Sequence, residues 1–177
     1  MATLKNPVSG EDHIQGDPKA PVLLVEYGDY ECPHCGHAQP IIKQVQKHFG
    51  KRLGFVFRNF PLREIHFNAE DAAEAAEYAA TKGKFWEMHD GIFENQKMLG
   101  VPMLLELAEK LGLSADYLNG ALSAGEFTGR VEQDFLGGVR SGVNGTPTFF
   151  INGHRHDGSF EFEELVAAIE ARVSDRA

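Results

Sequence analysis

The chain contains only two cysteines, Cys32 and Cys35, and both lie in the short stretch ECPHCG, residues 31–36. Two thiols separated by two residues can close a disulfide and reopen it, which is the chemistry of dithiol–disulfide exchange. The same spacing also provides half of a zinc site, but a structural zinc site needs two further ligands. Two cysteines in a chain of 177 residues are too few for a disulfide framework, so their role is local.

Cys32 lies where an apolar run ends and a helical pattern begins, so we expect it near a helix N-terminus. Free N–H groups and the helix dipole stabilise an anion there, and such cysteines have a pKa between ~3.5 and ~7.5 instead of about 8.5. Pro33 suits the first helical turn, where its missing N–H costs nothing. His34 adds a donor, and a positive charge when protonated, so we expect His34→Ala to raise the pKa of Cys32. The sequence therefore predicts a reactive thiolate at Cys32 and a resolving thiol at Cys35.

The elements that position the cysteines are a strand before them and a helix after them. The run VLLVEY, residues 22–27, is short and apolar, as in a buried central strand. Beyond the cysteines, one apolar helix face continues up to Gly50, which is placed to end the helix. The residues of that face are Ala38, Ile41, Ile42, Val45 and Phe49. Pro40 lies inside this helix and is expected to kink it, and residues 53–60 are typical of a second strand.

The pattern is helical from about residue 63 to residue 143. We expect Asn68 to cap the first helix of this block, Pro102 to open the third, and Ser114 to cap the fourth. In the fifth helix, the pair Gly137-Gly138 is unfavourable for helix formation. The expected apolar stripe of that helix is Val131, Phe135 and Val139.

The last part of the chain predicts a hairpin and a helix. Residues 148–151 are typical of a strand, and Asn152-Gly153 is a strong signal for a tight hairpin turn. Ser159 is placed to cap a final helix. The apolar face of that helix is expected to be Phe162, Leu165, Val166 and Ile169.

The order of elements is strand, helix, strand, a helical block, strand, strand, helix. This order predicts an α/β fold in which both halves share one sheet and the helical block lies at its side. We divide the chain into a polar lead-in (1–20), an α/β domain in two segments (21–62 and 144–177) and a helical insertion (63–143).

The stretch VEYGDYECPHCG, followed far downstream by GTPTFFING, resembles the DsbA-like members of the thioredoxin superfamily, in the bacterial branch with a helical insertion. The resemblance covers Pro21 to Ile169 and includes FRNFPL and KFWEMHDGIF. It implies a thioredoxin-like fold with an inserted all-helical subdomain. It also implies a thiol–disulfide oxidoreductase that acts on protein or peptide substrates, with a redox partner or glutathione and no bound cofactor. The direction stays open between oxidase, reductase and disulfide isomerase.

The resemblance assigns roles by position. The nucleophile of the family matches Cys32, and its resolving thiol matches Cys35. The cis-proline loop that faces the disulfide matches Thr146-Pro147, and the backbone of Thr146 would pair with the substrate chain. An acidic residue of the family in the first strand matches Glu26, where a buried carboxylate can take the proton of Cys35. A position of Glu26 at the exposed edge of its strand would exclude that role.

Two other functions remain as alternatives. In a metal-binding module, Cys32 and Cys35 would bind a metal together with histidines such as His37, His154 and His156. In a peptide-binding or chaperone protein, the aromatic segment around residues 85–88 would form the binding surface. The isolated histidines are expected at the surface or in packing positions, and they are His13, His48, His66 and His89.

Composition excludes some classes of protein. The formal net charge is -9, and no Lys/Arg cluster offsets it, which argues against binding to nucleic acid. No apolar run approaches the roughly 18 residues that a membrane span needs. The N-terminal segment lacks a basic region followed by an apolar one, which favours a cytoplasmic protein. A periplasmic or secreted protein whose signal had been removed would have the same sequence pattern.

Overall fold

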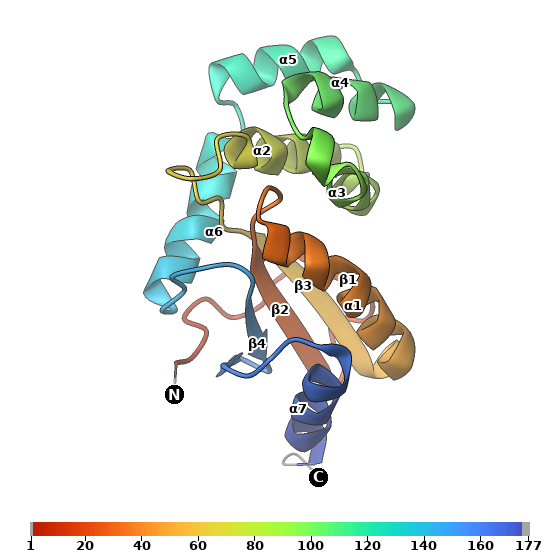
Figure 1. The fold of residues 1–177 in the computed structure, drawn as a ribbon, viewed down its shortest axis with the longest axis vertical. Helices are drawn as coiled ribbons and strands as arrows, with labels where there is room; N and C mark the ends of the chain where they lie inside the picture. The colour runs from red at the N-terminus through yellow and green to blue at the C-terminus, as the bar shows by residue number, and fades with distance from the viewer. Residues whose placement is uncertain (1, 175–177) are drawn as a thin grey trace.

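The computed structural model describes residues 2–174 as a five-stranded mixed sheet with helices on both faces and a helical block beyond one end (Figure 1). The strands are β1 (His13–Gln15), β2 (Val22–Gly28), β3 (Leu53–Asn59), β4 (Thr148–Ile151) and β5 (His154–His156). Their order across the sheet is β1-β3-β2-β4-β5. β2 and β3 are parallel and the other neighbours are antiparallel, so the predicted α/β fold with one shared sheet is confirmed.

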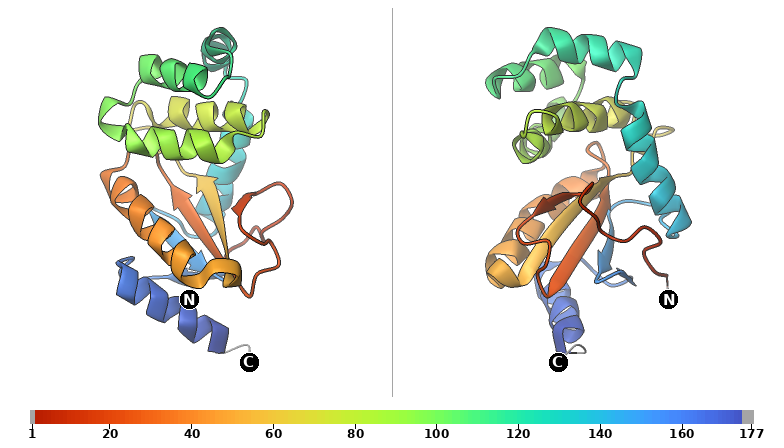
Figure 2. Two further views of the ribbon diagram at one scale, coloured as in Figure 1. Left: turned by 90° about the vertical axis from the view of Figure 1, so that its right-hand side faces the viewer. Right: turned by 180° about the vertical axis from the view of Figure 1, so that it is seen from behind.

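The helices are α1 (Pro33–Phe49), α2 (Ala69–Ala80), α3 (Phe85–Glu94), α4 (Val101–Lys110), α5 (Ala115–Ala124), α6 (Thr128–Arg140) and α7 (Phe162–Ser174). Two short 3-10 helices are η1 (Gly50–Arg52) and η2 (Gln96–Met98). α1 and α7 cover one face of the sheet, and α6 runs along the other face (Figure 2). α2 to α5 form the block beyond one end of the sheet, the end at which β2 connects to α1. We keep the domain limits given above as a proposal.

Most local predictions for the sheet and α1 are confirmed. Every residue of the predicted apolar face of α1 is buried, and Pro40 lies inside the helix. The hairpin turn has positive φ angles of 49° at Asn152 and 80° at Gly153, as expected for the tight turn that this dipeptide favours. The hydroxyl of Ser114 accepts a hydrogen bond from the Tyr117 N–H and so caps α5.

The prediction for α6 was only partly right. Val131 is buried, but Val139 is half exposed, and the face that packs on the sheet contains Gly137 and Gly138. A Cβ atom on Gly138 would lie 2.7 Å from the ring of Phe60. The two glycines therefore let α6 approach the aromatic side chains of the sheet closely, and this contact outweighs their unfavourable helix propensity.

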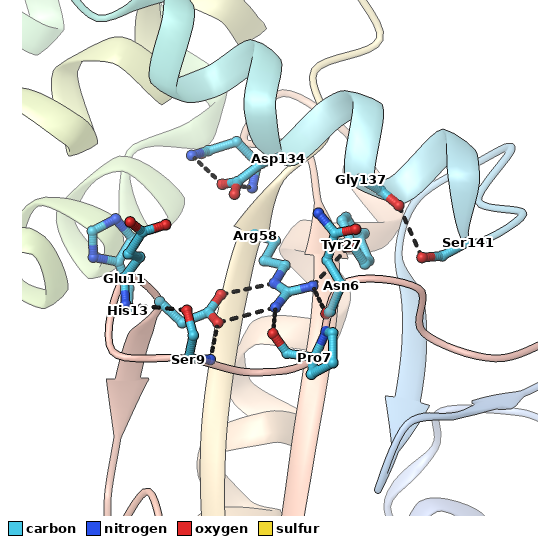
Figure 3. A network of polar contacts seen from close by, with 12 residues as sticks. Asn6, Pro7, Ser9, Glu11, His13, Tyr27, Arg58, Asp134, Gly137 and Ser141 are labelled. Atoms are coloured by element: carbon cyan, nitrogen blue, oxygen red, sulfur yellow. Dashed lines mark hydrogen bonds and ion pairs between the residues drawn. The ribbon is translucent and has the colours of Figure 1, made fainter.

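The polar lead-in contributes more structure than its composition suggested. It contains β1, which the sequence pattern did not reveal, and it is held by the buried side chain of Arg58 (Figure 3). The Arg58 guanidinium donates to both carboxylate oxygens of Asp12 at 2.7 and 3.0 Å. It also donates to the carbonyls of Asn6 and Pro7 and to the hydroxyl of Tyr27. Because a buried charge needs this many partners, Arg58 fixes the lead-in to the sheet.

Within residues 2–174, no helix is both long enough and apolar enough to cross a membrane.

Candidate active site

The two cysteines lie at the turn between β2 and α1, between the end of the sheet and the helical block (Figure 1). Cys32 is the N-cap residue of α1, with extended backbone angles of φ -68° and ψ 122°, and Pro33 occupies the first helical turn. Cys35 follows one turn inside the helix and is buried. The prediction that the pair lies where a strand connects to a helix is therefore confirmed.

Cys32 is in an environment that favours its thiolate. A hydrogen bond from the Cys35 thiol lowers the pKa of Cys32 to about 5 against the opposing effect of burial. The Thr146 side chain lowers this pKa further, and its hydroxyl has no hydrogen-bond partner among the described residues of the reduced protein. Backbone N–H groups of Cys35 and His34 add to the effect, as expected at a helix N-terminus. As a thiol, Cys32 donates to the carbonyl of Thr146 at 3.4 Å.

Cys35 differs from Cys32 in its protonation. Burial raises the pKa of Cys35 well above its ordinary value, and the hydrogen bond to Cys32 and the negative charge of Glu26 raise it further. The N–H of Asp29 opposes these effects by donating to the Cys35 Sγ atom at 3.4 Å. The two sulfurs share a hydrogen bond, and their pKa values are shifted in opposite directions, which favours a thiolate at Cys32 and a thiol at Cys35.

The His34 side chain lies apart from this arrangement. Its ring is exposed and makes no hydrogen bond or ion pair with any residue from 2 to 174, so its contribution to the Cys32 thiolate comes from its backbone N–H. The structure therefore gives no support to the expectation that the imidazole sets the pKa of Cys32.

The His34→Ala variant should accordingly titrate almost like the unchanged protein. We expect the pKa of Cys32 to move by less than about one unit, because the backbone N–H is retained and an exposed charge is screened by water. Thiolate absorbance followed against pH in both proteins measures the shift. A rise of two units or more in the variant would contradict this expectation.

The loop that precedes β4 faces Cys32 from the opposite side. Its Thr146–Pro147 peptide bond is cis. The Cys32 thiol contacts the Thr146 carbonyl, so the backbone of this loop lies next to the Cys32 sulfur. The structure thus brings Thr146 and Pro147 to the cysteine pair across more than a hundred residues of sequence.

Glu26 lies in the centre of the sheet, on β2, and is only 2% exposed, which excludes a position at an exposed edge. Burial raises the pKa of Glu26 to about 8, with a further contribution from the negative charge of Cys32. Its Oε1 atom has no hydrogen-bond partner in the described part of the chain. A Cβ atom on Gly28 would lie 3.0 Å from this oxygen, so the carboxylate extends along β2 toward the cysteine turn. The group is thus poised to hold or release a proton near neutral pH.

Long-range contacts that the sequence did not reveal hold the cysteine turn. Gln96, from η2, donates its amide N–H groups to the carbonyls of Tyr30 at 2.9 Å and Cys32 at 2.8 Å. A Cβ atom on Gly36 would overlap the Gln96 Oε1 atom, so the glycine after the second cysteine makes room for this contact. No local pattern marks Gln96, because its partners lie more than sixty residues away in the chain.

Asn68 is the N-cap residue of α2, as predicted, but the expected cap by its side chain is not formed. Its side chain makes no capping hydrogen bond and instead donates to Glu31 at 3.0 Å. The Asn68 N–H donates to the other oxygen of the same carboxylate at 2.7 Å. Glu31 immediately precedes Cys32, so this pair joins the start of α2 to the cysteine turn. His66, expected at the surface or in packing, also reaches the turn through a contact with Asp29 at 2.8 Å.

The two alternative functions gain no support from the geometry. Residues 2–174 contain no group of three or more His, Cys, Asp or Glu side chains that could hold a metal. His37 pairs with Glu161, and His156 contacts the carbonyl of Ser159. The aromatic segment of α3 packs inward, with Phe85 and Met88 buried in the core and Trp86 packed partly buried against it.

This chain is similar in sequence and in fold to known proteins. The family model described as Thioredoxin matches residues 8–171. Among solved structures, oxidised BdbD from Bacillus subtilis superposes with a TM-score of 0.87 at 26% identity, covering 98% of both chains. A thioredoxin-like oxidoreductase from Silicibacter pomeroyi has a TM-score of 0.79 at 26% identity over 96% of this chain and 95% of its own. Alpha-DsbA1 of Wolbachia pipientis shares the fold, with a TM-score of 0.82 at 21% identity over 97% and 95% of the two chains.

Curated relatives give a second kind of similarity. The chain is 44% identical over 158 residues to a protein named Na(+)/H(+) antiporter NhaA 1 from Salinispora arenicola. That match covers 89% of this chain and 24% of the relative. An antiporter of the same name from a Mycobacterium species is 44% identical over 172 residues, covering 96% and 28% of the two proteins. The chain thus spans about a quarter of the length of the curated relatives that it matches.

Proposed function

The chain belongs to the thioredoxin family and has the fold of its DsbA-like thiol–disulfide oxidoreductases, and from this premise we propose that it exchanges disulfides with protein substrates through Cys32 and Cys35. Cys32 is the nucleophile and Cys35 the resolving thiol. Glu26 exchanges a proton with Cys35, and Thr146 and Pro147 contact the substrate chain. No cofactor is needed, because the electrons move between sulfur atoms.

One observation carries this proposal more than any other. The pKa of Cys32 is lowered to about 5 by a hydrogen bond from the Cys35 thiol, whose own pKa is raised by burial. A thiolate is the attacking species in disulfide exchange, and about 99% of Cys32 is thiolate at pH 7 if its pKa is near 5. The neighbouring Cys35 stays protonated during the first attack and acts in the second step, in which it resolves the mixed disulfide.

The surroundings of the pair favour a polypeptide as the substrate. Three large apolar side chains are exposed close to segments that bond to the cysteine turn: Ile65 at 66%, Phe67 at 84% and Met98 at 74%. Phe67 precedes Asn68, which holds Glu31, and Met98 lies in the same short helix as Gln96. Apolar side chains of an unfolded or extended substrate can pack there while the Thr146 backbone pairs with its main chain.

The direction of exchange depends on the compartment. A stabilised thiolate favours the reduced form, which makes the disulfide form a strong oxidant. In a cytoplasm poised by glutathione, such a pair is held reduced and acts by reducing or reshuffling disulfides. In an oxidising compartment, a redox partner keeps the same pair in its disulfide form, and the protein transfers that disulfide to substrates.

The thiolate should also make the stability of the two redox forms depend differently on pH. The native pKa of Cys32, about 5, lies below its ordinary value of 9.0, so the stabilisation is full above pH 9 and is lost as the pH falls through 5. Only the reduced form carries this group. Allowing for repulsion from Glu26, we expect the reduced form to gain on the order of 2 kcal/mol over the oxidised form between pH 5 and pH 8.

Urea unfolding of both forms across this pH range tests the prediction, and equilibration with glutathione buffers gives the reduction potential independently. The contribution of disulfide closure to stability cancels in the comparison because it does not depend on pH. A difference in stability that stays constant from pH 5 to pH 8 would show that Cys32 is not a stabilised thiolate, and would remove the basis of the proposal.

A further inference from the structure

Asp29 is a buried acidic residue beside the cysteine pair that the exchange chemistry described above does not use. It is only 1% exposed, and its carboxylate accepts four hydrogen bonds. The Oδ1 atom accepts from the N–H groups of Glu31 at 2.7 Å and Cys32 at 3.2 Å. The Oδ2 atom accepts from the N–H of Leu62 at 2.8 Å and from the His66 ring at 2.8 Å.

These four bonds join two separate parts of the chain. The first two close a tight turn from Asp29 to Cys32, which the Asp29 carbonyl also stabilises by accepting from the Cys32 N–H at 3.1 Å. The other two hold the segment after β3, which carries the exposed Ile65 and Phe67. One side chain therefore fixes the nucleophile's backbone against the apolar segment that flanks it.

The same turn aims a backbone donor at the second cysteine. The Asp29 N–H points at the Cys35 Sγ atom at 3.4 Å, and it is the only hydrogen bond from outside the pair that residues 2–174 direct at this sulfur. Because the carboxylate of Asp29 holds the turn, it determines where the N–H of the same residue points.

We propose that Asp29 is a positioning residue for the resolving step, in which its side chain holds its own N–H on the Cys35 sulfur. The inference rests on the proposed function. In this step the Cys35 thiol gives its proton to Glu26 and the resulting thiolate attacks the Cys32 sulfur of a mixed disulfide. The Cys32–Cys35 bond forms, the bond to the substrate breaks, and the substrate sulfur leaves with the electron pair. The protein is oxidised and the substrate is reduced.

Negative charge develops on the Cys35 sulfur during this step, and the Asp29 N–H is aimed at that sulfur. The Cys32 thiolate of the first attack is stabilised instead by the Cys35 thiol and the N–H groups of His34 and Cys35. A hydrogen bond to a charged group is roughly twice as strong as one between neutral groups, and it depends on direction. Loss of the Asp29 carboxylate should consequently slow resolution while leaving the first attack by Cys32 nearly unchanged.

The test uses Asp29→Asn in the full chain. An amide cannot accept from both pairs of donors, because whichever way it turns, its NH2 group faces at least one backbone N–H. With a disulfide-bonded peptide as substrate, we expect resolution of the mixed disulfide to slow about tenfold, so that the adduct accumulates. The rate of adduct formation should stay within about threefold of the unchanged protein.

Asp134→Asn is the matched control. Asp134 is also a buried carboxylate that accepts a backbone N–H, that of Asn59 at 2.9 Å, but it lies on α6 away from the cysteines. It should lose stability without accumulating the adduct. A second variant, His66→Ala, removes one of the four bonds to Asp29 and should slow resolution by a smaller factor in the same direction.

Resolution at the normal rate in Asp29→Asn, or equal slowing by Asp134→Asn, would overturn the inference, because the effect would then be absent or merely a loss of stability. If Asp29→Asn does not fold, the rate of resolution in His66→Ala becomes the test. A rate equal to that of the unchanged protein would then overturn the inference. Failure of the proposed function has a different signature, since the unchanged protein would then form no adduct and exchange no disulfide.

Discussion

A Cys35→Ser variant should accumulate mixed disulfides with its substrates through Cys32, whereas a Cys32→Ser variant should form almost none. The reason is the difference between the two sulfurs. Cys32 is mostly thiolate at neutral pH because its pKa is lowered to about 5, while burial raises the pKa of Cys35. Without Cys35 the adduct cannot be resolved, so it persists.

The expected effect on turnover is large for both variants. Loss of a nucleophile that acts as a unit with its partner removes at least about a thousandfold of activity. Adducts with a disulfide-bonded peptide can be counted by mass spectrometry under non-reducing conditions, with the double serine variant as the blank. If both single variants trapped substrate equally, the assignment of Cys32 as nucleophile would be wrong.

Replacement of Glu26 by glutamine should slow the resolving step by about a hundredfold, because general-base transfer of this kind contributes roughly 10² to 10⁴. The carboxylate is buried, its Oε1 atom is unpartnered, and its pKa is raised to about 8, first by burial and then by the charge of Cys32. Glutamine keeps the shape of the side chain but cannot accept the proton of Cys35. In the unchanged protein, the rate of the resolving step should rise with pH around the pKa of Glu26, about 8. This rise should be absent from the variant.

The same variant should become more stable at neutral and alkaline pH. The native pKa of Glu26, about 8, lies above its ordinary value of 4.5, so between these values the native state binds more protons than the unfolded state. Stability due to this group therefore falls as the pH rises from 4.5 to 8. Glutamine removes that loss, which we expect to be on the order of 3 kcal/mol at pH 7.

Glu74→Gln provides the control for this prediction. Glu74 is also a buried carboxylate whose pKa is raised by burial, but it lies on α2 and contacts Thr128. Its replacement should raise stability without slowing exchange. Urea unfolding and single-turnover exchange measured on both variants separate the two roles. A Glu26→Gln variant that exchanged disulfides at the normal rate would remove Glu26 from the mechanism.

Local patterns predicted the elements that carry the cysteines. The apolar face of α1, the short apolar run of β2 and the Asn152-Gly153 turn each follow from the geometry of a single element, which repeats along the chain with a fixed period. Pro33 and the end of β2 likewise placed Cys32 at the start of a helix. The resemblance added Thr146, Pro147 and Glu26, which local patterns could not join to the cysteines.

Only the tertiary structure decided what surrounds the thiols. Asp29 joins the cysteine turn to the N–H of Leu62, and Gln96 and Asn68 bond to the same turn from distant segments of the chain. The exposed ring of His34 plays no part in these hydrogen bonds. The glycines of α6, unfavourable for a helix on their own, are needed where that helix meets the ring of Phe60. Periodic patterns report which face of an element is buried. The partner of a polar side chain depends instead on how two elements meet, and no repeat along either of them records that.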